Sequence, residues 1–265
     1  MTNEQQIAAR FVDARRAATG FSDFPGELPA DLDAAYRAQK AAIAAWNDRI
    51  AGWKVGRVQP HLVEQLEAER FVGPIFARSV TVAGATNDFP MIRGGSALFE
   101  AEVVIVVATD APSDKTDWTV EEADALIGAV HVGIEVAGSP LETMNQLSTV
   151  VSIAGFGNNN GLILGAEVTD WRERGWEGII CRTTIDGEFV REANAGMVPG
   201  EPLGVFAYAL GQAARLGFPL RQGDCISTGA ITGMNVVTIG QHCIAEFVGI
   251  ATVECRITAA LPTLV

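Results

Sequence analysis

Hydrophobic residues recur at helical spacing through the first fifty residues of the chain. The pattern predicts one helix over residues 4–19 and another over roughly 29–50, with a glycine-containing and aromatic segment between them. The apolar stripe of the second helix consists of Leu32, Ala35, Tyr36, Gln39, Ala42, Ile43 and Trp46. We therefore expect residues 1–50 to form a small helical N-terminal region.

After this region, short β-rich runs alternate with glycine, and such runs predict strands. Two helices should interrupt them, one over residues 119–130, where Thr119 or Asp117 could cap the first turn, and one over residues 202–216. Further strands are expected at residues 224–230, 236–239, 243–248 and 251–257. The predicted fold class is α+β and mainly β, with residues 51–265 as the β-rich domain.

One predicted strand carries two carboxylates at the mouth of a long apolar run, Phe99–Ala108. Successive side chains of a strand point to opposite faces, so Glu100 and Glu102 share a face with Val104 and Val106. Both faces of the strand therefore look buried, and two like charges would lie at the edge of a dry layer. If the two carboxylates were left unpaired, their burial would cost several kcal/mol of folding free energy, or they would take up protons.

A divalent cation would balance these two buried negative charges, and a third carboxylate on a neighbouring segment could complete the set of ligands. Glu135 lies in a second apolar stretch, residues 131–139, with no lysine or arginine near it in sequence. The competing interpretation is a solvated strand face, which is the usual setting of a glutamate. Because Glu135 is a third carboxylate in an apolar stretch, the metal site is favoured over the solvated face. The sequence predicts that Glu100, Glu102 and Glu135 form it. Ligands that are all carboxylates favour Mg2+ or Mn2+ over Zn2+.

Composition narrows the classes of partner. The chain has 265 residues, of which 48% are hydrophobic, enough for a large core. Its net charge is −13 and its only lysines are Lys40, Lys54 and Lys115, so neither nucleic acid nor an anionic membrane surface is an expected partner. The N-terminus lacks the apolar stretch of a signal peptide, and no run reaches the length of a membrane span. We therefore expect a cytoplasmic protein.

Two further places are candidates for catalysis. Lys54 lies in a short strand between glycines, where it could pair with a substrate carboxylate or stabilise an enolate, or simply extend its stem along the surface. His61 and Glu64 follow Pro60 at positions i and i+3, which places both on one face of a short helix. Such a pair can hold an imidazole in place as an acid/base dyad, although an exposed histidine at a helix start is the commoner arrangement.

A set of motifs, taken together, resembles one known family. In chain order they are Leu32-Asp-Ala-Ala-Tyr-Arg-Ala-Gln39, Gly52-Trp-Lys-Val-Gly56, Glu100-Ala-Glu102, Ile134-Glu135, Gly161-Leu-Ile-Leu-Gly165, Gly223-Asp224, Thr228-Gly-Ala-Ile-Thr232 and Ala245-Glu-Phe-Val-Gly249. Their order and spacing resemble the 2-keto-4-pentenoate hydratase and 2-oxohex-3-enedioate decarboxylase branch of the fumarylacetoacetate hydrolase superfamily. The resemblance implies a mixed β-roll or sandwich behind the helical region. It also implies Mg2+ at Glu100, Glu102 and Glu135, and a catalytic Lys54.

The chain departs from this branch in three stretches. Hydratases of the branch usually carry a Pro-Asp-Tyr-Gly-like stretch where this chain reads Arg70-Phe-Val-Gly73, so the expected acidic residue is missing. An Asp-Asn and small-hydroxyl segment is replaced by Gly155-Phe-Gly-Asn-Asn-Asn160. Conversely, Val55-Gly-Arg57 and His61-Leu-Val-Glu64 resemble the lid of the superfamily's C–C hydrolases and oxaloacetate decarboxylases, with one residue fewer between them.

These observations favour a metal-dependent lyase that acts on a small 2-oxo or 2-hydroxydienoic acid, as in the catabolism of aromatic meta-cleavage products. Hydration is the leading reaction, because a cation that binds the 2-oxo group and the adjacent carboxylate stabilises an enolate. Decarboxylation passes through the same enolate, and hydrolysis of a β-diketone by His61 and Glu64 is a further alternative. A non-catalytic binding protein that kept the fold is an alternative of another class. We also expect a homo-oligomer.

Overall fold

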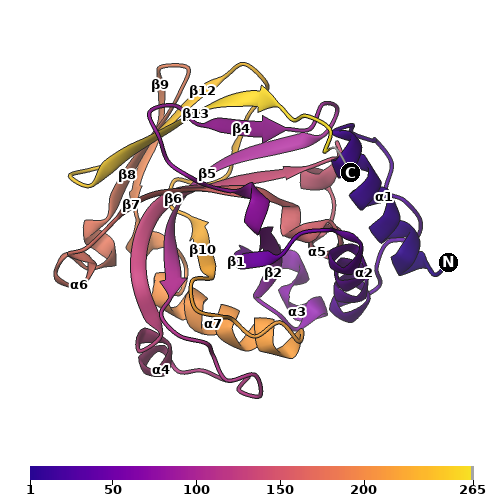
Figure 1. The fold of residues 1–265 in the computed structure, drawn as a ribbon, viewed down its shortest axis with the longest axis horizontal. Coiled ribbons are helices and arrows are strands. Elements are labelled where there is room, and N and C mark those ends of the chain that lie inside the picture. The colour runs from indigo at the N-terminus through magenta and orange to yellow at the C-terminus, as the bar shows by residue number, and fades with distance from the viewer. Residues whose placement is uncertain (264–265) are drawn as a thin grey trace.

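The computed structural model describes residues 1–263, and two β-sheets form its body (Figure 1). The larger sheet has eight strands, seven of them in the order β2-β1-β10-β5-β6-β7-β3, while β11 pairs with β5. Its strands are β1 (Ile50–Arg57), β2 (Arg70–Phe76), β3 (Val80–Val82), β5 (Ser96–Val107), β6 (Ile127–Ser139), β7 (Asn159–Glu167), β10 (Cys225–Ala230) and β11 (Asn235–Val236). The fold is mixed and rich in strands behind a small helical N-terminal region, as the sequence predicts.

The smaller sheet has five strands in the order β4-β13-β12-β8-β9 and lies along the top of the view in Figure 1. Its strands are β4 (Asp88–Met91), β8 (Ile180–Ile185), β9 (Glu188–Asn194), β12 (His242–Phe247) and β13 (Ala251–Ala259). The inward side chains of β8, β12 and β13 are buried in the same apolar cluster as β5 and β6. The two sheets therefore share one core.

Seven α-helices surround the sheets among the described residues. They are α1 (Asn3–Ala17), α2 (Leu32–Ala45), α3 (Val63–Leu66), α4 (Val120–Asp124), α5 (Thr149–Ala154), α6 (Trp171–Arg174) and α7 (Glu201–Arg215). Single 3-10 turns are η1 (Pro60–Leu62), η2 (Ala77–Ser79), η3 (Met144–Gln146), η4 (Phe156–Asn158), η5 (Trp176–Gly178) and η6 (Ala195–Met197). None of the helices in residues 1–263 is long and apolar enough to cross a membrane.

The helical N-terminal region matches its sequence pattern. A capping box between Thr2 and Gln5 starts α1, and the Asp31 side chain accepts from the Ala34 amide to start α2. The two helices pack against each other at the right of Figure 1. Helix α2 ends earlier than predicted, because the chain turns after Trp46 to enter β1. A domain boundary at residue 50 stays a prediction.

The helix predicted over residues 119–130 is much shorter in the structure. Thr119 does form a capping box with Glu122, but α4 ends at Asp124. The next residues belong to β6, which begins at Ile127 and pairs with β5. The β-branched side chains of Ile127 and Val130 fit a strand better than a helix, and burial against β5 decides the competition. The strand predicted at residues 236–239 is likewise reduced to β11.

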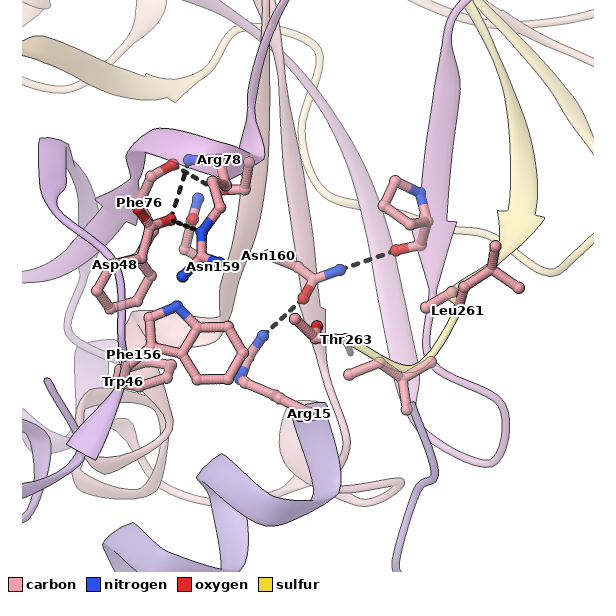
Figure 2. A pocket seen from close by; sticks show the side chains of 14 residues that line it. Arg15, Trp46, Asp48, Phe76, Arg78, Phe156, Asn159, Asn160, Leu261 and Thr263 are labelled. Carbon is pink, nitrogen blue, oxygen red and sulfur yellow. Dashed lines mark hydrogen bonds and ion pairs between the residues drawn. The ribbon is translucent and has the colours of Figure 1, made fainter. Parts of the chain in front are cut away.

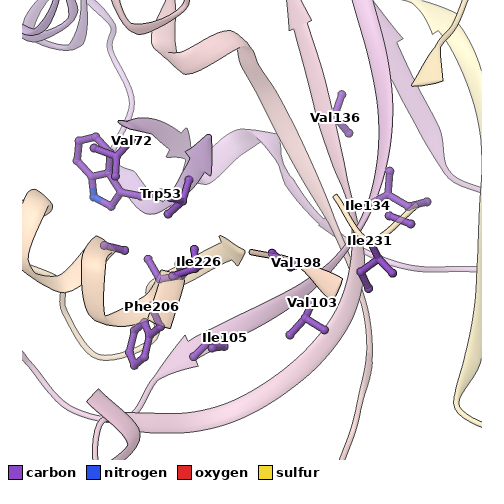
Figure 3. Packing of buried hydrophobic residues seen from close by; sticks show 14 of the residues in the cluster. Trp53, Val72, Val103, Ile105, Ile134, Val136, Val198, Phe206, Ile226 and Ile231 are labelled. Carbon is purple, nitrogen blue, oxygen red and sulfur yellow. The ribbon is translucent and has the colours of Figure 1, made fainter. Parts of the chain in front are cut away.

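The larger sheet curls, so that its two faces have different surroundings. On one face, Val103, Ile105, Trp53 and Ile226 pack against α7, and Figure 3 shows Phe206 of α7 near Ile105 and Ile226. On the other face, a separate buried cluster joins Ile75, Val104, Leu162 and Cys225 from four strands. Because Val104 shares its face with Glu100 and Glu102, the carboxylates line the same interior as this second cluster.

Candidate metal centre and active site

Three carboxylates meet on two neighbouring strands. Glu100 and Glu102 lie on β5, and Glu100 is directly opposite Glu135 in the antiparallel pairing with β6. One carboxylate oxygen from each residue lies within 4.8 Å of the others. The side chains are almost closed to solvent, with exposures of 5% for Glu100, 1% for Glu102 and 0% for Glu135. Period-2 alternation along β5 and the register of β6 thus build the carboxylate cluster predicted from sequence.

Lys54 is the cation of this cluster. Its Nζ lies 3.2 Å from Glu135 Oε1, and its side chain is 7% exposed. It faces the cluster because β1 pairs with β10, and β10 pairs with β5, so that Lys54, Ser227 and Val104 are neighbours across the sheet. Burial by itself would lower the pKa of Lys54, but the three carboxylates, Glu135 first, outweigh it and raise the pKa above its usual range. Lys54 is therefore an ammonium at neutral pH.

Hydrogen bonds orient two of the carboxylates. Asn159 Nδ2 donates to Glu135 Oε1 at 3.1 Å, and the Gly229 amide donates to Glu102 Oε2 at 2.8 Å. The Ser227 hydroxyl also donates to Glu102 Oε2. The second oxygen of Glu135, Oε2, is buried and has no hydrogen-bond partner among the described residues. An orphaned carboxylate oxygen beside two further carboxylates is an arrangement that a cation would satisfy.

The electrostatics of the cluster also fit a divalent cation. Burial, followed by the charge of Glu135, raises the pKa of Glu100 to about 7, and burial and both neighbouring carboxylates raise the pKa of Glu102 well above its usual range. With all three carboxylates ionised and Lys54 protonated, the formal charge of the cluster is −2, which one divalent cation balances. Oxygen ligands of this kind are those that Mg2+, Mn2+ and Ca2+ prefer.

A close backbone contact borders the cluster beside Lys54. A Cβ placed on Gly73 of β2 would lie 2.4 Å from the Phe156 carbonyl oxygen, and one on Gly157 would lie 2.6 Å from the Gly73 Cα. Gly157 also has a φ of 66°, in the left-handed region, and the same added Cβ would lie 3.3 Å from Lys54 Cδ. Only glycines at both positions let η4 approach β2 this closely, and the contact fixes the space around the Lys54 side chain.

His61 and Glu64 lie outside this cluster. His61 belongs to η1 and Glu64 to α3, and both side chains are exposed. Among residues 1–263, no hydrogen bond or ion pair joins them. The structure therefore does not bring the two side chains together or to the carboxylates, and their role as a catalytic dyad stays a prediction.

Sequence reasoning missed several residues that shape the centre. Ser227, Gly229 and Asn159 act on the carboxylates from distant parts of the chain, and no local pattern around them signals it. Phe71 could have been found, because it stands in the stretch where hydratases of the resembled branch carry an acid. Its buried ring lies with its centroid 5.8 Å from Lys54 Nζ.

The fold and the cluster together define an enzyme whose buried carboxylates can hold a metal ion. The family model described as fumarylacetoacetate (FAA) hydrolase C-terminal matches residues 37–258. The chain belongs to this family, which confirms the resemblance seen in its motifs.

Curated relatives share most of the chain at low identity. A 2-keto-4-pentenoate hydratase of Paraburkholderia phymatum is 26% identical over 258 residues, which cover 94% of this chain and 95% of the relative. A second 2-keto-4-pentenoate hydratase, from Burkholderia vietnamiensis, is 25% identical over 214 residues, which cover 80% of this chain and 79% of the relative.

Solved structures show the same fold. The 4-oxalocrotonate decarboxylase from Pseudomonas putida G7, complexed with magnesium and adipate, has a TM-score of 0.78 at 21% identity, covering 96% of this chain and 97% of its own. A fumarylpyruvate hydrolase from Pseudomonas aeruginosa, in complex with Mn2+ and pyruvate, has a TM-score of 0.56 at 16% identity, covering 80% of this chain and 91% of its own.

Proposed function

We propose that this chain is a Mg2+-dependent lyase that hydrates a small 2-oxo or 2-hydroxydienoic acid. The observation that carries the proposal is the buried cluster of Glu100, Glu102 and Glu135 with Lys54, whose residual charge of −2 suits one divalent cation. The relatives named 2-keto-4-pentenoate hydratase, which align along most of the chain, support the substrate class. Mn2+ is the alternative ion, because the ligand set is the same.

Glu100, Glu102 and Glu135 would hold the ion, and all three lie in the proposed catalytic domain, residues 51–265. A divalent cation bound there would supply positive charge to stabilise an enolate of the substrate. Ser227 and the Gly229 amide keep Glu102 in place, and Asn159 does the same for Glu135. These residues position the ligands and need not touch the substrate.

Lys54 would donate a proton or a hydrogen bond in the reaction. Because its pKa is raised, it carries a proton that it can give or share, and it cannot act as a general base near neutral pH. Its ammonium would bind the substrate carboxylate or donate a hydrogen bond to the oxygen that gains negative charge. The proton to be removed from water would then go to another group, and His61, held by Glu64, is our candidate if η1 and α3 close over the site.

Decarboxylation is the second candidate, and Phe71 favours it. Hydration needs a positioned water, whereas decarboxylation mainly needs the electron sink and room for CO2 to leave. Phe71 places an apolar ring beside Lys54 in the stretch where hydratases of the branch carry an acidic residue. An apolar wall there removes one polar group that could hold a water.

A substrate panel tests the proposal. The pure protein with Mg2+ is incubated with 2-hydroxypenta-2,4-dienoate, 2-oxohex-3-enedioate and an acylpyruvate, and the loss of ultraviolet absorbance and the release of CO2 are followed. We expect turnover of the dienoate that EDTA abolishes. CO2 from the enedioate would assign a decarboxylase, and cleavage of the acylpyruvate would assign a C–C hydrolase. Binding of Mg2+ and oxalate without turnover of any compound would overturn the enzymatic proposal.

A further inference from the structure

A cavity of about 220 Å³ lies beside the carboxylate cluster and has a different chemistry (Figure 2). Helix α1, the end of α2, β2, η4, β7 and the C-terminal segment all contribute to its wall. Its lining includes Arg15, Trp46, Phe76, Phe156, Asn160 and Leu261. The neighbouring Asn159 also lines the cavity, while its side chain donates to Glu135. The cavity is thus separate from the metal centre but adjacent to it.

Arg15 is the unusual residue of this cavity. It is 8% exposed, and its guanidinium donates only to neutral acceptors: to Asn160 Oδ1 at 2.6 Å, to the Gly138 carbonyl at 3.0 Å and to the Gly155 carbonyl at 3.3 Å. Its Nε is buried without a hydrogen-bond partner, and no carboxylate in residues 1–263 forms an ion pair with it. Burial lowers the pKa of Arg15, yet an arginine stays charged in a protein.

The other charged groups at the cavity do not compensate Arg15. Arg78 pairs with Asp48 at 3.4 Å, so these two neutralise each other. In a chain with a net charge of −13, a buried cation that finds no counter-charge among residues 1–263 is an exception that calls for an anion. The neighbouring carboxylate cluster has the opposite charge.

One part of the wall is aromatic, whereas Ser79, Asn160 and Thr263 add polar groups elsewhere. Trp46, Phe76 and Phe156 contact one another with ring centroids 5.0 to 6.1 Å apart, and the Arg15 guanidinium lies over the Phe156 ring at 5.2 Å. Leu261 closes the rim opposite these rings. An apolar cavity of roughly 150 Å³ is enough to hold benzene, so the larger space here has room for a ring and one carboxylate.

We propose that this cavity binds a small aromatic monocarboxylate, with its carboxylate on Arg15 and its ring against Trp46. The ligand would replace the missing counter-charge of Arg15 and cover the aromatic wall at the same time. Nothing in this assignment depends on the proposed lyase reaction, because the ligand contacts neither Lys54 nor the carboxylates.

Benzoate is the probe, and calorimetric titration of the full chain in EDTA is the measurement. Chelation keeps benzoate from binding a metal ion in the carboxylate cluster. We expect saturable binding of benzoate, accompanied by a change in the tryptophan fluorescence of the protein. Benzamide has the same shape without the charge and should bind at least about tenfold more weakly, as should benzoate to Arg15→Met, since each loses a charge-assisted hydrogen bond. Arg10→Met on the same helix, whose guanidinium lies over Phe21, should bind like the parent.

A second variant keeps the test valid if Arg15→Met fails to fold, since Arg15 also holds two backbone carbonyls. Leu261 is 83% exposed at the rim, so Leu261→Trp should fold normally and obstruct the cavity with Arg15 intact. It should weaken benzoate binding at least about tenfold as well. The proposal is overturned if millimolar benzoate gives no binding, if benzamide binds equally well, or if Leu261→Trp binds benzoate like the parent.

Discussion

The two carboxylate oxygens of Glu135 have different surroundings. Its Oε1 accepts from Lys54 and from Asn159, while its buried Oε2 has no partner among the described residues. Oε1 therefore binds the Lys54 ammonium, and Oε2 remains available to a metal cation from solution. A glutamine at this place could offer an oxygen to only one of these two partners without presenting an N–H to the other.

The carboxylate cluster is tested by removing one formal charge at a time. Glu102→Gln keeps the shape of the side chain but lowers the negative charge of the cluster. We expect Mg2+ affinity to fall at least about tenfold, because the loss of groups that merely support a ligand already costs 10- to 100-fold. Turnover should fall with it, and Glu100→Gln and Glu135→Gln should behave alike. Calorimetric titration with Mg2+ and steady-state kinetics provide the two readouts.

The matched control is Glu188→Gln, an exposed glutamate on β9 that should change neither quantity. In EDTA, Glu102→Gln should unfold at the same temperature as the parent or higher, since it relieves repulsion between buried carboxylates. If all three cluster variants bound Mg2+ and turned over substrate like the parent, the metal centre would lie elsewhere.

His61 and Glu64 require a different experiment, because both are exposed in the structure. If the segment that carries them closes over the substrate, His61→Ala should lower kcat by about 10²- to 10⁴-fold and leave Mg2+ affinity unchanged. Glu64→Gln should lower kcat less than His61→Ala does, since Glu64 only orients His61. Gln65→Ala, an exposed neighbour, is the control. Full turnover by His61→Ala would make the pair an ordinary surface pair and leave the proton transfers to Lys54 and water.

The residues of the metal centre differ in how far sequence could locate them. Glu100 and Glu102 could be placed on one face because strand alternation is local, and Glu135 because a carboxylate in an apolar stretch is conspicuous. Asn159 could not be placed, because its contact with Glu135 follows from irregular register between β6 and β7 near Ala137. Such irregularities depend on tertiary packing, which no local pattern encodes.

Among the elements, the contact between β2 and η4 is the most sensitive to a single methyl group. Gly73→Ala would place its Cβ against the Phe156 carbonyl and the Gly157 Cα, both of them backbone atoms that cannot rotate away. We expect a loss of about 1–3 kcal/mol in unfolding free energy from overpacking, together with reduced turnover through displacement of Lys54. Urea unfolding monitored by circular dichroism measures the first quantity.

Gly204→Ala provides a control of opposite sign. Gly204 lies inside α7, and nothing is within 4 Å of an added Cβ. The substitution should stabilise the protein by about 0.5–1 kcal/mol through helix propensity alone. If Gly73→Ala were as stable and active as the parent, the contact would be more adaptable than its distances indicate.

At the scale of elements, the short α4 shows where sequence patterns reach their limit. Of the two candidate caps, Thr119 and Asp117, Thr119 is the one that starts the helix. The end of that helix was not visible, because Ile127 to Val130 could extend the helix or begin a strand. Pairing with β5 across the sheet decides between them, and that pairing is a non-local interaction.

For the whole molecule, we expect stability to depend on a metal ion bound at the cluster. A ligand that binds only the folded state stabilises it by about 2.7 kcal/mol at one hundred times its Kd. For a chain of this size, that corresponds to an increase in Tm of roughly 5–10 °C. Calorimetric scans with Mg2+ and with EDTA should show this difference, and Glu102→Gln should show little of it. A parent Tm that does not respond to Mg2+ would contradict the metal centre.

The arrangement of the sheets is the part of the fold that sequence periodicity could not supply. Strand positions followed from hydrophobic runs, but the parallel pairing of β1 with β10 joins Lys54 to Ser227, which are 173 residues apart in the chain. This pairing places Lys54 beside the carboxylates. Only the family resemblance linked Lys54 to the carboxylates in the sequence analysis, because no local sequence pattern indicates that they are neighbours.

The order of the strands also has a consequence for synthesis on the ribosome. Strands β5 and β6 follow each other in the chain and pair along their lengths, so Glu100, Glu102 and Glu135 can meet as soon as this hairpin emerges. Lys54 is made earlier, but its strand reaches β5 only through β10, which begins 86 residues after the end of β6. The register of this hairpin alone brings the three carboxylates together, whereas their ammonium requires pairing between distant parts of the chain.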